Sequence, residues 1–116
     1  MRVVIQPVQQ KEQRYETIGD YFVDDGVLQI RVTKQRDWRY EFLIALHELI
    51  EEATTRNLGI KEEDILAFDV GPVGGKSDDP GSMTEAPYHK QHVFAENVER
   101  LVAAELGVDW EEYSKI

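Results

Sequence analysis

The sequence contains no cysteine, so it can form neither disulfide bonds nor thiolate metal sites. It also lacks an apolar run long enough to cross a lipid bilayer, and the apolar stretch that follows Met1 is too short for a signal peptide. These absences predict a cytoplasmic protein that does not associate with membranes. The 116 residues are enough for one compact domain, which we expect to span residues 1–116.

Basic residues are scarce as well, with 13 Lys and Arg against 23 Asp and Glu and a formal net charge of −10. Phosphate backbones repel such a surface, and the clustered basic residues that nucleic-acid binding requires are missing. The composition therefore argues against direct nucleic-acid binding. An acidic surface favours solubility, and it also leaves open a protein or peptide partner of unknown identity.

Three short runs rich in β-branched and apolar residues precede the first predicted helix. Residues 2–8 and 17–23 favour two strands. Residues 24–26, Asp-Asp-Gly, are typical of a tight hairpin turn, because Asp-Gly accepts the positive φ angles that such turns need. Residues 27–32 alternate apolar and polar side chains towards their end, as half-buried strands do. We therefore predict a small antiparallel sheet of three strands.

A long amphipathic helix is predicted over residues 37–58. Asp37 is a plausible N-cap, and Gly59 fits the left-handed position that follows many helices. On a helical wheel, His47 and Glu51 lie at the border between an apolar and a polar face. The apolar face, which we expect to meet the core, consists of Phe42, Leu46, Leu49, Ile50 and Ala53. The polar face, which we expect to meet solvent, consists of Glu41, Glu48 and Glu52.

The second half of the chain predicts further helices. Residues 61–68 favour a short helix, and residues 69–87 are rich in Gly, Pro, Ser and Asp, as expected for a long loop that is mobile or acts as a lid. A second main helix is predicted from Tyr88 to Gly107, and Asp109 opens a last short helix. The expected core stripe of the second main helix is Phe94, Val98, Leu101 and Val102. The predicted fold class is α+β, with the small antiparallel sheet packed against two main helices.

Each of the two main helices carries a histidine and a glutamate four residues apart, His47 with Glu51 and His92 with Glu96. Side chains at this spacing lie one above the other, so both can reach one ion. Imidazole and carboxylate suit Zn²⁺, and also Mn²⁺, Fe²⁺ or Ni²⁺. We predict that these four residues hold one divalent metal, with zinc favoured. The alternative is that each pair is an ordinary ion pair on a helix surface.

The third histidine, His89, lies three residues before His92. It could replace Glu96 as a ligand or support the site from outside. Because His89 lies near the predicted start of its helix, an exposed side chain is the favoured interpretation.

The sequence His47-Glu48-x-x-Glu51 resembles the His-Glu-x-x-His signature of zincin metallopeptidases, with glutamate in place of the second histidine. The resemblance implies that His47 and Glu51 are ligands on one helix and that His92 or Glu96 supplies a ligand from a later helix. It also implies that Glu48 is the general base. In such enzymes an upstream strand at a sheet edge binds the substrate, and residues 27–32 are the candidate here.

Two further segments carry a second resemblance. Residues 44–52, Ile-Ala-Leu-His-Glu-Leu-Ile-Glu-Glu, and residues 86–92, Ala-Pro-Tyr-His-Lys-Gln-His, are similar to segments of small, uncharacterised phage and prophage proteins. That resemblance extends over most of the chain and implies no activity.

The expected function is that of a divalent-metal-binding protein with a zincin-like helix pair. In its active form the protein would be a metal-dependent hydrolase of peptides or other amides, with Glu48 accepting a proton from water. If all four predicted ligands bound the ion, the site would be closed and the metal structural. The alternative is a non-catalytic, phage-type accessory or protein-interaction protein with an acidic surface.

Overall fold

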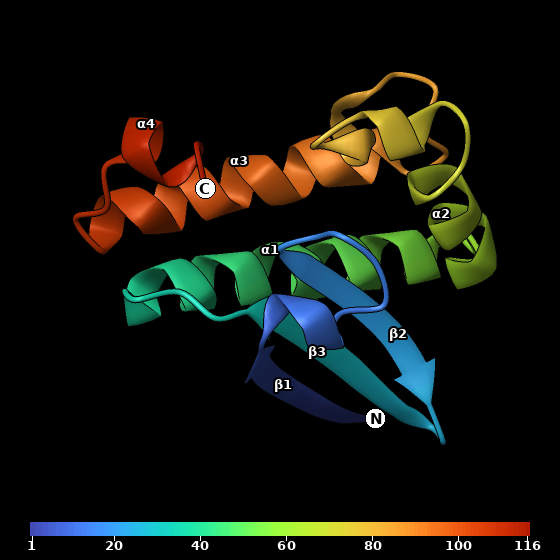
Figure 1. The fold of residues 1–116 in the computed structure, drawn as a ribbon, viewed down its shortest axis with the longest axis horizontal. Helices are drawn as coiled ribbons and strands as arrows, with labels where there is room; N and C mark the ends of the chain where they lie inside the picture. Colours follow the sequence, from blue (N-terminus) through green and yellow to red (C-terminus); the bar gives the residue numbers. More distant parts are fainter.

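The computed structural model describes residues 1–116 and contains one sheet and four α-helices. The sheet consists of β1 (Arg2–Val8), β2 (Gly19–Asp24) and β3 (Val27–Thr33). The helices are α1 (Trp38–Asn57), α2 (Glu62–Asp69), α3 (His89–Glu105) and α4 (Trp110–Tyr113). Helix α1 contacts the sheet on one side and α3 on the other, and α2 and α4 lie towards opposite ends of this arrangement (Figure 1). The predicted α+β class is confirmed.

The sheet is mixed, with the strand order β1-β3-β2. β2 and β3 form the predicted antiparallel hairpin, whose turn has positive φ angles at Asp25 and Gly26. β1, however, pairs with β3 in parallel, so the prediction of an entirely antiparallel sheet is wrong for β1. Leu28, Ile30 and Val32 are at most 1% exposed, and this burial suits β3 to the central position. The strand predicted at a sheet edge is therefore the central one, and the edges are β1 and β2.

Helix α1 has the predicted ends but not the predicted faces. The side chain of Asp37 accepts a hydrogen bond from the backbone N–H of Arg39, and Gly59 has a φ of 73° just beyond the helix. The predicted core residue Phe42 is 47% exposed and Ala53 is exposed, whereas the predicted solvent residues Glu48 and Glu52 are buried. The prediction of the two faces is wrong for these residues because α1 lies between the sheet and α3, where polar side chains fill part of the space.

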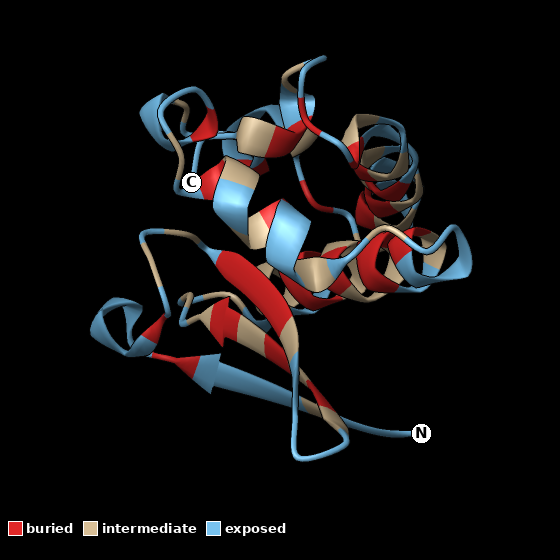
Figure 2. Cartoon of the chain, turned by 90° about the vertical axis from the view of Figure 1, so that its right-hand side faces the viewer, coloured by how far each residue is buried: buried red, intermediate tan, exposed pale blue.

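Helix α3 shows the same inversion. Two members of its predicted core stripe, Phe94 and Leu101, are 53% and 72% exposed. The buried side of α3 consists instead of His92, Ala95, Glu99 and Ala103. Small alanine side chains allow the two helices to approach closely, and the histidine and glutamate project into the space between them. Figure 2 shows buried residues concentrated where the sheet and helices face one another, whereas β1 is largely exposed.

The predicted loop over residues 69–87 contains two 3₁₀ turns, Gly74–Lys76 and Pro80–Ser82, and the second of these packs against α3. This connection thereby brings residues 79–81 next to the first turns of α3. None of the helices combines the length and the apolar composition that a bilayer-spanning segment needs.

Candidate metal centre

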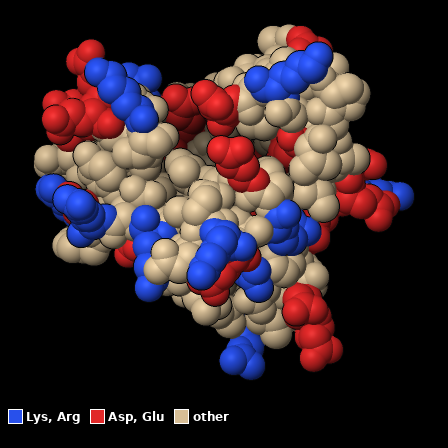
Figure 3. Space-filling model, in the orientation of Figure 1, with Lys and Arg blue, Asp and Glu red and all other residues tan.

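A cleft of about 750 Å³ opens between β2, α1, α3 and the connection that precedes α3. Figure 3 shows a hollow in the face of the molecule, with acidic side chains gathered along its wall. His47, Glu51 and His92 line this cleft.

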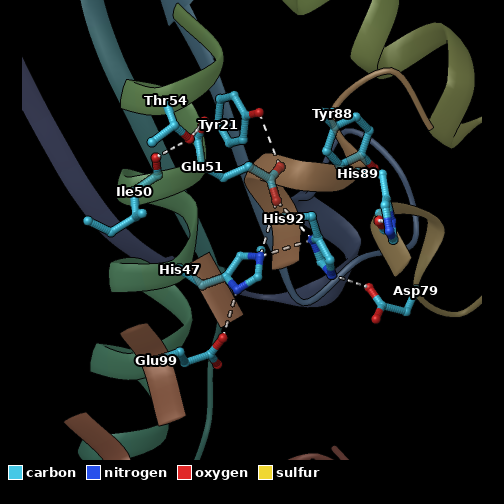
Figure 4. A network of polar contacts seen from close by, with 12 residues as sticks. Tyr21, His47, Ile50, Glu51, Thr54, Asp79, Tyr88, His89, His92 and Glu99 are labelled. Atoms are coloured by element: carbon cyan, nitrogen blue, oxygen red, sulfur yellow. Dashed lines mark hydrogen bonds and ion pairs between the residues drawn. The ribbon is translucent and has the colours of Figure 1, made fainter. Parts of the chain in front are cut away.

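Three side-chain atoms from α1 and α3 converge in the cleft (Figure 4). His47 Nε2 lies 3.1 Å from Glu51 Oε2 and 3.1 Å from His92 Nδ1. The third distance, from His92 Nδ1 to Glu51 Oε2, is 2.9 Å. These three residues form the only group of at least three His, Asp or Glu side chains in the chain whose ligand atoms all lie within 4.8 Å of one another.

The spacing of these atoms fits a cation. The facing atoms of His47, Glu51 and His92 lie within 3.1 Å of one another, so all three residues could hold one divalent ion. A set of two histidines and one carboxylate would leave other coordination positions free of protein ligands. The same ligand set serves Zn²⁺ in hydrolases and Fe²⁺ in oxygenases.

In each of the two histidines, the ring nitrogen that faces away from the triad, here called the remote nitrogen, contacts a carboxylate. His47 Nδ1 lies 2.7 Å from Glu99 Oε1, and His92 Nε2 lies 3.1 Å from Asp79 Oδ1. When the remote N–H donates to a carboxylate, the other nitrogen presents its lone pair to the shared point. Histidines that bind metals are almost always oriented in this way. The two histidines that could hold an ion therefore both have the carboxylate partners that are typical of metal-binding histidines.

Tyrosines from two other elements fix the carboxylates. Tyr21 on β2 donates a hydrogen bond of 3.1 Å to Glu51 Oε1, which leaves Oε2 directed at the two histidines. Tyr113 on α4 donates to Glu99. Because each carboxylate has a second partner, its side chain is restrained from both sides, and the orientation of the triad depends on the sheet and on the last helix.

The connection before α3 packs directly on His92. A Cβ atom at Gly81 would collide with Nδ1 of His92, so this position requires the absence of a side chain. His89 Nδ1 lies 2.9 Å from the carbonyl oxygen of Gly81, and the half-buried His89 therefore contacts the loop and is not part of the triad. The expectation of an exposed His89 is wrong, because the loop folds back over the first turn of α3.

Hydrogen bonds to carboxylates outweigh the effect of burial on the pKa of both triad histidines. Burial lowers the pKa of both histidines, but hydrogen bonds to Glu51 and Glu99 raise the pKa of His47 to about 11. Hydrogen bonds to Asp79 and Glu51 similarly raise the pKa of His92 to about 10. These hydrogen bonds therefore favour the protonated form of both imidazoles when no cation is bound. The facing nitrogens of the two rings lie 3.1 Å apart, and one shared cation would take the place of the protons that they hold.

Glu48 lies beside the triad without a partner of its own. It is 9% exposed, lines the cleft and makes no hydrogen bond or ion pair. Its carboxylate passes over Gly19, where an added Cβ would lie 2.6 Å from Glu48 Oε1. Burial raises the pKa of Glu48 well above its usual value, and the charge of Glu51 raises it further. A carboxylate whose pKa is raised takes up a proton more readily than an exposed glutamate does.

Glu96, the fourth predicted ligand, is only partly buried and lies outside the triad. The inward-facing carboxylate on α3 is Glu99, which the spacing argument missed. Seven residues advance a helix by about 700°, so Glu99 lies within about 20° of His92 around α3, whereas Glu96 lies about 40° to the other side. A search for seven-residue spacing could have found Glu99. Asp79, Tyr21 and Tyr113 come from other elements, and no local pattern marks them.

Comparisons of the chain with protein-family models, with curated proteins and with solved structures find no match.

Proposed function

We propose that the protein binds one divalent metal ion, with zinc favoured, through His47, Glu51 and His92. The observation that carries this proposal is the convergence of three ligand atoms within 3.1 Å of one another. The carboxylates on both remote imidazole nitrogens support it, because ion pairs on a helix surface do not require such partners. Glu96 is omitted from the ligand set because it lies outside the group.

We further propose that the site is a metal-dependent hydrolase centre for peptides or other amides. When bound, a divalent ion polarises a carbonyl group and lowers the pKa of a water molecule. Glu48 accepts the proton of that water, as its place next to His47 in the zincin-like signature suggests. A ligand set of three residues supports catalysis, because it leaves a coordination position for water or substrate.

The resemblance to zincins supports this proposal, but the candidate strand for substrate binding differs from the one expected from the sequence. The strand next to the site is β2, which lies at a sheet edge and whose Tyr21 contacts Glu51. β2 therefore replaces residues 27–32 as the candidate strand for substrate binding.

The alternative is a non-catalytic, phage-type accessory or protein-interaction protein with an acidic surface, in which the His-Glu pairs are ordinary ion pairs. The apolar side chains on the outer faces of α1 and α3 favour this alternative, because exposed apolar residues are typical of protein interfaces. Trp38, Phe94 and Leu101 are 65%, 53% and 72% exposed.

Elemental analysis of the purified protein tests the metal site and identifies the ion among Zn, Mn, Fe and Ni. One equivalent of metal is expected, and His47→Ala or His92→Ala should remove it. Glu96→Gln is the matched control on α3 and should retain the metal. Absence of metal from the wild-type protein after incubation with each ion, and a melting temperature that a chelator does not change, would exclude the site.

The Glu48→Gln variant distinguishes a catalytic from a structural metal. It should retain one equivalent of metal and lose hydrolysis of a mixed peptide library, because an amide cannot accept the proton. A variant with full metal content and undiminished hydrolysis would show that Glu48 is not the base.

A further inference from the structure

The cleft that contains the metal site is much more acidic than the rest of the molecule. Ten acidic side chains line it, against three basic ones, Arg14, Lys76 and Lys115. With histidines counted as neutral, the cleft accounts for seven of the ten excess formal negative charges of the chain. Charges of one sign along a concave wall reinforce one another, and low-dielectric surroundings focus their field into the opening.

The metal site itself explains only part of this charge. Glu51 contacts the triad histidines, Glu99 and Asp79 orient them, and Asp20 is paired with Arg14 at 2.7 Å. Three other carboxylates of the cleft, Glu16, Asp78 and Glu96, make no hydrogen bond or ion pair, and the first two are exposed to solvent. A bound divalent ion would cancel two charges and still leave the cleft strongly negative.

Glu48 is an independent indication of a ligand. A carboxyl group with 9% exposure normally has a hydrogen-bonding partner, because burying an unpaired polar group is costly. Glu48 has none within the protein, although it lines the cleft. A partner from outside, either the water that is split or a donor group of the substrate, would satisfy it.

We propose that the cleft binds a peptide segment that carries a Lys or Arg side chain close to the bond that is cleaved, an assignment that rests on the proposed hydrolase function. Glu16, Asp78 and Glu96, which line the cleft without a partner, attract the positive side chain, and the peptide backbone lies across the triad. In the reaction the oxygen of water bonds to the carbonyl carbon, the C–N bond breaks and the amine nitrogen takes the proton. No oxidant or further reactant is required.

Binding of three labelled octapeptides tests this proposal independently of turnover. The peptides alternate leucine with lysine, with serine or with glutamate, and fluorescence anisotropy reports their binding to the zinc-loaded protein. The lysine peptide should bind at least about tenfold more tightly than the serine peptide and weaken as salt is added, whereas the glutamate peptide should not bind. Equal affinity for the lysine and serine peptides, or no binding of the lysine peptide, would overturn the proposal.

Two triple variants show whether the cleft or the overall charge attracts the lysine peptide. The cleft variant Glu16→Gln, Asp78→Asn, Glu96→Gln and the control variant Glu63→Gln, Glu105→Gln, Glu112→Gln remove the same charge, and the control residues lie outside the cleft. The cleft variant should bind the lysine peptide about tenfold more weakly, at about twofold per charge, and the control should change less than about twofold. Equal weakening of both would overturn the proposal.

Cleavage of the same peptides is measured separately, by mass spectrometry. Selective binding of the lysine peptide without zinc-dependent cleavage would support the cationic ligand and reject the hydrolase. Cleavage of the serine peptide as fast as the lysine peptide would support the hydrolase and reject the cationic ligand. The two proposals therefore fail by different results.

Discussion

At the scale of single residues, the orientation of two imidazole rings decides whether the cluster can bind a cation. His47 uses Nε2 and His92 uses Nδ1, so the rings differ in the nitrogen that they present to the triad. Each choice is fixed by the carboxylate on the opposite nitrogen, Glu99 for His47 and Asp79 for His92. Restrained rings lose little freedom on binding an ion, which increases the affinity for it.

Replacing Glu99 by glutamine tests this role of the carboxylate. Glu99→Gln keeps the size of the side chain but removes the charge that stabilises the Nδ1–H of His47. Zinc affinity, measured by competition with a chromophoric chelator, should fall about 10- to 100-fold. Glu96→Gln, three residues earlier on α3, should leave the affinity unchanged. If the two variants have the same zinc affinity, Glu99 does not support the metal site.

The helical repeat explains which residues of the site could be predicted from sequence. His47 and Glu51 lie four residues apart on one helix, and the sequence alone shows that their side chains are adjacent. The prediction that His92 lies beside this pair depends on how the two helices pack. In the structure, His92 Nδ1 lies 3.1 Å from His47 Nε2. Glu96 lies outside the triad, because the side of α3 that faces α1 depends on the packing of the two helices, which periodicity alone does not determine.

At the scale of elements, α1 is unusual in having a buried polar strip on the side that would normally be apolar. Local signals predicted its ends, because the Asp37 cap and the Gly59 conformation depend only on neighbouring residues. Its faces could not be predicted, since the buried side combines the apolar Leu43, Ile44 and Ala45 with three glutamates, and Phe42 lies on the exposed side. For the same reason the hairpin of β2 and β3 was predictable from its turn, and the parallel partner of β1 was not.

The connection before α3 acts as a structural element of the site, and its Gly81 offers a test. Gly81→Ala would push a methyl group against His92 and shift the ring or the loop. Zinc content after equilibration should fall, and the free energy of unfolding should decrease by about 1–3 kcal/mol, as for overpacked cores. The matched control is Gly75→Ala in the same connection, where the added Cβ would meet Val70 at 3.1 Å and not the site. A Gly81→Ala protein with full zinc content would contradict this role of the connection.

At the scale of the whole molecule, the acidic residues are concentrated in one cleft. Their total number alone does not show this. The net charge of −10 was known from composition, but not that seven of these charges line one cleft. The interior space between α1, α3 and β2 holds Glu48, Glu51 and both triad histidines, and burial together with their mutual contacts shifts the pKa of each of these groups. Folding stability should therefore depend on pH and on metal in a linked way.

The pH dependence of the metal-free protein follows from the raised pKa values of the histidines. The pKa of His47 is about 11 and that of His92 about 10 in the folded state, against about 6.5 in the unfolded chain. A raised folded pKa adds stability that is complete below pH about 6.5 and is lost as pH rises towards 10–11. The raised pKa of Glu48 acts in the same direction, because the folded state holds that proton more tightly as well. The melting temperature without metal should therefore decrease steadily from pH 6.5 to 9.5.

Zinc should reverse this trend, because the ion takes the place of the two imidazole protons. Binding at pH 7 should release up to about two protons per ion, which calorimetric titration in buffers of different ionisation enthalpy measures directly. The increase in melting temperature on adding zinc should be larger at pH 8.5 than at pH 6.5, since protons compete less at the higher pH. The double variant His47→Gln, His92→Gln should show neither effect. A wild-type protein that binds zinc without releasing protons would mean that the imidazoles are neutral before binding, and the hydrogen bonds to Glu51, Glu99 and Asp79 would then not control their charge.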